Sequence, residues 1–284
     1  MRSITAKLSF GMAITAIGIF VGSTAALAQP HSLGLTELSA EDTTAVQSQA
    51  GRAGNIQTTD YLVPHISTVP ANFGKRVELF VREKVGSRRR GNGPVVLMIA
   101  GATASAIPVF DLQFENYGWM DYLAAAGFDV FAMDLTGYGL SPRPMMDDPC
   151  NTATSEQQLL IPGRLAQPCS PAYPFQLTTI QSDWDEIDRV VDYLRRVRNV
   201  DKVSLIAWSR GGPRAGGYTA RHPEKVERLF LLAPAYQRLS QSVPPAALPL
   251  PGVPSTVLAS ADFHKLWDTQ VGCASQFTPQ IRSG

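Results

Sequence analysis

The sequence predicts an α/β fold, in which a mostly parallel sheet carries helices on both faces. Two observations lead to this prediction. Four short, continuous apolar runs are typical of strands that are buried on both faces, and segments with helical patterning lie between them. Because strands that alternate with helices form parallel crossover units, ligand sites are expected at the carboxyl ends of the strands. A chain of 284 residues, 44% of them hydrophobic, is long enough for a substantial core.

The N-terminus has the order of a secretory signal. Two basic residues precede an uncharged stretch, and Ala26-Leu27-Ala28 provides small residues for cleavage before Gln29. We therefore expect residues 1–28 to be a signal peptide, a periplasmic or secreted location, and no stable membrane insertion after cleavage. The alternative is a retained membrane anchor, because the uncharged stretch approaches the roughly 20 residues that span a bilayer.

The elements are expected in the following order. Residues 29–60 show no hydrophobic period and are interpreted as an extended or flexible lead-in to a core at 61–240. Residues 76–85 alternate as an edge or hairpin strand does. Buried strands are predicted at 94–100, 129–135, 202–209 and 226–234. Helices are predicted at 118–127, which ends at a glycine, and at 178–200, where apolar residues recur at helical spacing between Trp184 and Val197.

The segment 145–177 is rich in proline and polar residues and is interpreted as a long insertion without a core of its own. Cys150 and Cys169 lie within it, and a disulfide between them would close it. Cys273 is then either free or paired elsewhere. The cysteines lack C-x-x-C spacing and no histidine cluster accompanies them, so neither a metal nor another cofactor is predicted.

The balance of charge gives no reason to expect a polyanionic partner. The chain carries 25 Lys and Arg against 24 Asp and Glu, a formal net charge of +1. A nearly neutral chain has no broad attraction to nucleic acid or to anionic lipid.

One short motif carries chemistry. The run Ala207-Trp208-Ser209-Arg210-Gly211 differs by one residue from G-x-S-x-G, in which a serine lies on a sharp turn between a strand and a helix. Small residues at Ala207 and Gly211 allow the strand and the helix to approach, and the helix N-terminus directs free N–H groups towards a developing negative charge. Ser209 is therefore a candidate nucleophile, although a serine hydroxyl is weak until a base activates it.

Together with "IAGAT", "DLTGYGLSPRP" and "HPEKVERLFLLAPAY", this motif resembles the α/β-hydrolase superfamily from about Tyr61 to about Tyr236. The cysteine-containing segment is similar to an exported bacterial branch. The resemblance implies that Ser209 is the nucleophile and that the backbone N–H groups of Ala102 and Arg210 form the oxyanion hole. It also implies hydrolysis of a small-molecule ester or related acyl substrate without a cofactor. Serine rather than aspartate at this position disfavours epoxide hydrolase chemistry, and Asp134 is interpreted as a structural residue of its own loop.

Two residues depart from the pattern of this superfamily. Ala100 stands where many relatives have histidine, and Ala207 stands where most have glycine. The elbow can still form with the small side chain of Ala207. Ala100 lacks the polar group that would support the loop carrying the oxyanion hole.

The base that would activate Ser209 is harder to identify in this sequence. In the superfamily the chain order is serine, acid, histidine. His31 lies in the lead-in, His65 is expected before the first strand, and His222 follows Ser209 along one helix at a distance of about 20 Å. His264 is the remaining candidate by position, in a region, 241–284, that resembles part of a lid.

Three explanations stay open. The chain is a fragment that lacks the C-terminal strands, part of the lid, the acid and the histidine; or it is a catalytically inactive binding protein with the same scaffold; or it uses His264 with Asp262 or Asp268. The fragment hypothesis is favoured, because a complete member would need on the order of a hundred further residues.

Overall fold

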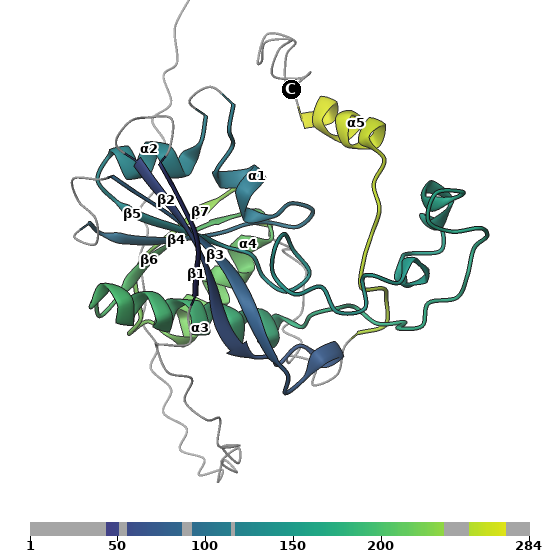
Figure 1. The fold of residues 1–284 in the computed structure, drawn as a ribbon, viewed down its shortest axis with the longest axis horizontal. Helices are drawn as coiled ribbons and strands as arrows, with labels where there is room; N and C mark the ends of the chain where they lie inside the picture. Colours follow the sequence, from purple (N-terminus) through teal and green to yellow (C-terminus); the bar gives the residue numbers. More distant parts are fainter. Residues whose placement is uncertain (1–43, 51–55, 87–92, 115–116, 236–249, 271–284) are drawn as a thin grey trace, which may run out of the picture. The chain divides into compact units, whose positions relative to one another are not determined.

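In the computed structural model, the described residues are 44–50, 56–86, 93–114, 117–235 and 250–270. They form one sheet in the order β1-β2-β3-β5-β4-β6-β7 (Figure 1). The half from β5 to β7 is parallel, whereas β1, β2 and β3 are antiparallel to their neighbours. The strands are β1 (Thr44–Ala50), β2 (Ile56–Ile66), β3 (Arg76–Gly86), β4 (Val95–Ile99), β5 (Asp129–Met133), β6 (Val203–Trp208) and β7 (Val226–Leu232).

Helices cover both faces of the sheet, as the sequence predicts (Figure 1). One face packs against α1 (Ala106–Phe110) and α2 (Trp119–Ala125), and the other packs against α3 (Ile180–Arg198) and α4 (Gly211–Arg221). The remaining helices are η2 (Pro70–Asn72), η3 (Pro149–Asn151), η4 (Gln157–Leu160) and α5 (Ser260–Gln270). The α/β fold class is therefore confirmed.

The longest helix, α3, shows why the sequence forms these elements. Thr179 and Ser182 form a capping box, in which each side chain bonds the backbone N–H of the other. The helix ends at Asn199, whose left-handed φ of 50° stops the helical path. Its apolar stripe is buried from Trp184 to Leu194, and Val197 is more than a third exposed in the last turn.

The core has two parts, one on each face of the sheet. In β4, Val95, Leu97 and Ile99 belong to the cluster beneath α3 and α4, whereas Val96 and Met98 belong to the cluster beneath α1 and α2. Strands β4 and β5 are buried along their whole length, as predicted for the middle of such a sheet.

Strand β7 differs from the prediction of a buried strand. Only Val226 of this strand is buried, and Phe230 is 53% exposed. Within the described residues, β7 is the edge of the sheet, and α4 packs against it from one side. An apolar run therefore does not show whether both faces of a strand are covered.

The lead-in expected at residues 29–60 also differs. Strand β1 and the first residues of β2 lie there, and β2 pairs with β3 from Ile56 opposite Gly86 to Ile66 opposite Arg76. Polar residues open β2, so hydrophobic periodicity does not reveal a strand whose backbone hydrogen bonds define it. His65 consequently lies within β2 and not before the first strand.

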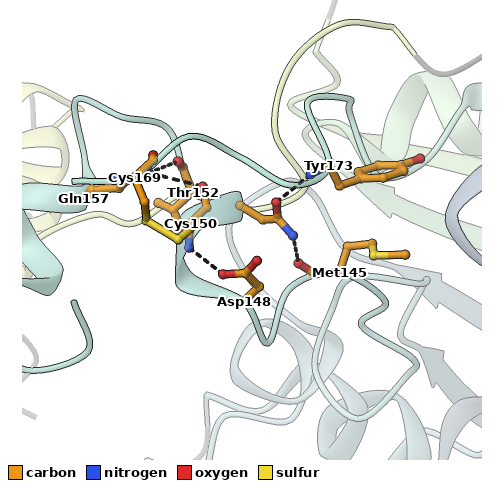
Figure 2. The surroundings of a disulfide bond; sticks show 8 residues. Met145, Asp148, Cys150, Thr152, Gln157, Cys169 and Tyr173 are labelled. Atoms are coloured by element: carbon orange, nitrogen blue, oxygen red, sulfur yellow. Dashed lines mark hydrogen bonds between the residues drawn. A yellow bond between two sulfur atoms is a disulfide. The ribbon is translucent and has the colours of Figure 1, made fainter. Parts of the chain in front are cut away.

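The insertion contains the predicted disulfide, and Figure 2 shows its surroundings. Cys150 and Cys169 are bonded, which confirms that prediction. The buried amide of Gln157 donates to the carbonyl oxygens of both cysteines and accepts from the N–H of Cys169. The buried Asn151 binds Met145 and Tyr173 in the same way, so polar contacts hold a segment that has little apolar core.

Residues 250–257, which we call the strap, lie along this insertion. Inside the disulfide loop, the hydroxyls of Thr152 and Ser255 are 3.1 Å apart and the N–H of Val257 donates to Glu156. Outside the loop, the N–H of Gln176 donates to the carbonyl of Leu250. The strap leads directly into α5.

The expected signal peptide at 1–28 and Cys273 lie outside the described residues, as does the part of the expected lid at 241–249 and 271–284. Among the helices that are described, none combines the length and the apolar character needed to cross a membrane.

Candidate active site

Ser209 lies on the turn between β6 and α4, with an unusual backbone conformation. Its φ is +54°, in the left-handed region that side chains disfavour. Such a conformation costs on the order of 1–3 kcal/mol and persists only where the surroundings impose it. The residue is partly exposed, so the strained turn presents a hydroxyl that solvent can reach.

The surroundings that impose this turn come mainly from the end of β7. The N–H of Ser209 donates to the carbonyl of Leu232 over 3.0 Å. The carbonyl of Ser209 accepts from the N–H groups of Gly212 and Ala235, both at 2.9 Å. Both backbone polar groups of Ser209 are therefore paired, and the turn is held from the helix side and from the neighbouring strand.

Two glycines permit the close contacts around this turn. A Cβ on Gly211 would lie 2.4 Å from the carbonyl oxygen of Ile99, and a Cβ on Gly101 would lie 2.8 Å from the Cβ of Ser209. Larger residues would force the backbone apart at both points. The loop that follows β4 is thus in direct contact with Ser209.

This loop, residues 101–105, is called the oxyanion loop below, after the role that the resemblance implies for Ala102. Thr103 within it also has a positive φ, of 70°, and its hydroxyl donates to the carbonyl of Ala102. Within the described part of the chain, the backbone N–H groups of Ala102 and Arg210 donate to no other residue. An oxyanion hole requires free N–H groups of this kind beside the nucleophile, and Ser209 is the candidate here.

Asp134, at the end of β5, holds the far end of the oxyanion loop. Its carboxylate accepts from the N–H of Ala106 at 2.7 Å and from the N–H of Leu140 at 3.1 Å. Burial raises the pKa of Asp134, and the two N–H groups oppose that rise. These bonds confirm the interpretation of Asp134 as a structural residue of its own loop.

Two buried ionisable groups lie behind the turn, and the sequence analysis missed both. Glu186 is fully buried and accepts from the N–H of Thr136 at 2.8 Å, and burial raises its pKa to about 8. Arg214 of α4 donates from Nε to Asp183 at 2.7 Å. A usable signal existed, because Asp183 and Glu186 fall four positions before apolar residues of the buried α3 stripe.

The histidines do not approach Ser209 where the structure describes them. His264 is exposed on α5, and no hydrogen bond between described residues involves the Ser209 hydroxyl. His65 is buried on β2, four strand spacings or about 19 Å from β6, and burial lowers its pKa to about 4. His222 caps the C-terminal end of α4, as expected. His31 lies outside the described residues.

A comparison with known families places the chain in one of them. Residues 94–259 match the model of a family described as the alpha/beta hydrolase fold. The chain belongs to the α/β-hydrolase fold family. The matched range includes the oxyanion loop, the Ser209 turn, the insertion and the strap.

The individual proteins that resemble this chain match it over a short range or at low identity. The poly(3-hydroxyalkanoate) polymerase subunit PhaC of Allochromatium vinosum is 38% identical over 99 residues, which is 34% of this chain and 28% of that protein. A lipase candidate from Sulfolobus solfataricus has a TM-score of 0.47 at 14% identity, over 72% of this chain and 53% of that one. An epoxide hydrolase from Vigna radiata has a TM-score of 0.40 at 19% identity, over 68% and 45%. The chain spans about half the length of these structures or less.

Proposed function

We propose that this protein is an exported serine hydrolase that cleaves an ester or related acyl bond through Ser209. The Ser209 hydroxyl would attack the acyl carbon, and the N–H groups of Ala102 and Arg210 would bind the oxyanion. Expulsion of the alcohol would leave an acyl-enzyme, which water would hydrolyse to release the acid. Losing one oxyanion donor in such a site costs about 3–4 kcal/mol of transition-state stabilisation.

The single observation that carries this proposal is the backbone of Ser209. Its left-handed turn is held by three backbone hydrogen bonds and stands in contact with Gly101. A scaffold function does not need a strained serine at a strand end, whereas a nucleophile does. Membership in the α/β-hydrolase fold family supports the same interpretation.

We also propose that this chain is part of a longer polypeptide. The base and the acid would come from further strands after the lid, which agrees with the partial coverage of the relatives. A signal peptide at residues 1–28 would direct the protein to the periplasm or the outside of the cell, where the Cys150–Cys169 disulfide is stable.

The test compares two polypeptides, the 284 residues alone and the same chain extended by its complete reading frame. We expect the extended chain to hydrolyse a short-chain aryl ester and the 284-residue chain to show little turnover. Ser209→Ala in the extended chain should lower kcat/KM by at least about 10³-fold, because the nucleophile is lost. Rapid turnover that survives Ser209→Ala would exclude the proposal.

A second candidate is a binding protein with the same scaffold and no catalysis. The observation that favours it is the Ser209 hydroxyl, which has no hydrogen-bond partner in the described residues. A fluorophosphonate that labels Ser209 in the extended chain would exclude this candidate. An absence of both labelling and turnover in the extended chain would favour it.

A further inference from the structure

Arg214 lies in the helix that follows the Ser209 turn, and it lines a cavity together with residues of the oxyanion loop. It is near the start of α4, the helix that begins after Ser209, and it is only 8% exposed. With Ala100, Gly101 and Ala104 it lines a small cavity of about 10 Å³. That volume is room for about one water molecule.

The orientation of Arg214 is determined by its contacts with α3. Its Nε donates to the buried carboxylate of Asp183 at 2.7 Å, and its carbonyl accepts from the indole N–H of Trp184 at 3.0 Å. On the other side, the guanidinium carbon lies 5.6 Å from the ring centre of Tyr138, which follows β5 and lines the same cavity. A planar guanidinium offers five N–H donors, so bonding to Asp183 leaves donors for its other neighbours.

The oxyanion loop needs support at the end nearest Ser209. Asp134 holds its far end through the N–H of Ala106, whereas Thr103 is in a strained conformation near the middle. Ala100, at the end of β4, offers only a methyl group to this space. Arg214 is the basic residue among those that line the cavity, whose other polar lining residues are Asp134 and Tyr138.

We propose that Arg214 is a positioning residue, which supports the oxyanion loop across this cavity and keeps the N–H of Ala102 directed at the oxyanion. The inference rests on the proposed function in assigning that N–H a catalytic role. A simpler role, in which Arg214 only joins α4 to α3 through Asp183, makes a different prediction. It predicts lower global stability without a specific change in the loop.

The experiment uses the extended chain and the variants Arg214→Lys and Arg214→Met. The matched control is Arg221→Met, because Arg221 lies on the same helix, stacks over Trp184 and does not line the cavity. The first readout is amide hydrogen exchange of Ala106, the hydrogen-bonded N–H that adjoins the loop, relative to β4, and it requires no catalysis. The second is the labelling of Ser209 by a fluorophosphonate, separated into affinity and maximal rate.

We expect both Arg214 variants to exchange at least 10-fold faster at Ala106 while β4 keeps its protection. The maximal labelling rate should fall at least 10-fold with little change in affinity, and Arg221→Met should match the unmodified chain. Arg214→Lys keeps the charge and tests the proposal even if Arg214→Met fails to fold. Unchanged exchange at Ala106 in Arg214→Lys would overturn the inference. If the unmodified chain is not labelled at all, the proposed function fails, and the exchange result still decides the role of Arg214 in the loop.

Discussion

Glu186 illustrates how one residue can oppose the stability of the fold that contains it. Its carboxyl group is fully buried on α3, where burial raises the pKa to about 8 from an ordinary value near 4.5. Between these two values the folded chain holds a proton that the unfolded chain has released. Stability therefore falls as the pH rises through this window, by about 1.4 kcal/mol per pH unit at most, and becomes level above pH 8.

Glu186→Gln should remove this pH dependence. Glutamine keeps an oxygen that accepts from the N–H of Thr136, and it does not titrate. We expect the variant to be more stable than the unmodified chain by an amount that widens by about 1 kcal/mol or more from pH 5 to pH 8, as measured by urea unfolding. Glu78→Gln, at an exposed position of β3, is the control. A stability difference that stays constant with pH would contradict this interpretation of Glu186.

At the scale of the element, the helix α4 contains a matched pair of glycines. A Cβ on Gly211 would meet the backbone oxygens of Ile99 and Ala100 at 2.4 and 2.8 Å, whereas a Cβ on Gly216 would meet nothing within 4 Å. Gly211→Ala should therefore displace the Ser209 turn and cost about 1–3 kcal/mol in the free energy of unfolding. Gly216→Ala should stabilise the chain by up to about 1 kcal/mol through helix propensity.

Thermal or urea unfolding of the two variants measures this contrast, and fluorophosphonate labelling follows the turn itself. If both alanines had the same effect, helix propensity alone would explain α4, and the close approach of β4 to the turn would not constrain it.

At the scale of the whole molecule, the sequence predicts the layers better than the edges. The alternation of apolar runs and helical patterns predicted β3, β4, β5, β6, α2 and α3, because burial on both faces leaves a clear hydrophobic signal. It could not reveal β1 or the start of β2, where polar residues pair by backbone hydrogen bonds, nor the exposure of β7. Patterns along a chain do not report which element lies beside which.

The candidate site was also predicted only in part, and the reason is the same. The Ser209 motif predicted a turn between a strand and a helix, because a local backbone conformation requires particular small residues on either side. Glu186 and Arg214 were missed, because their roles depend on contacts between α3, α4 and the loop after β5. The spacing of Glu186 places it beside the buried stripe of α3, but a single sequence does not show which distant residue such a side chain contacts.

The loop closed by the disulfide is hydrogen-bonded to the strap, a segment about a hundred positions further along the chain, and this leads to a last prediction. The strap at 250–257 has one anchor inside the disulfide loop, at Thr152 and Glu156, and another outside it, at Gln176. Removing the bridge releases the constraint on the loop, which is worth about 3 kcal/mol for a loop of this length. The inner anchor should therefore loosen while the outer one remains.

Replacing Cys150 and Cys169 together by serine should raise amide hydrogen exchange at Val257 at least 10-fold, with little change at Gln176 or in β4. The unmodified chain reduced with dithiothreitol should show the same pattern, which separates loss of the bridge from an effect of the substitutions. Equal protection of Val257 in the oxidised and reduced chains would mean that Gln157 and its hydrogen bonds hold the loop without the disulfide. An increase at Val257 alone would show that the bridge controls how the chain enters α5, the helix that carries His264.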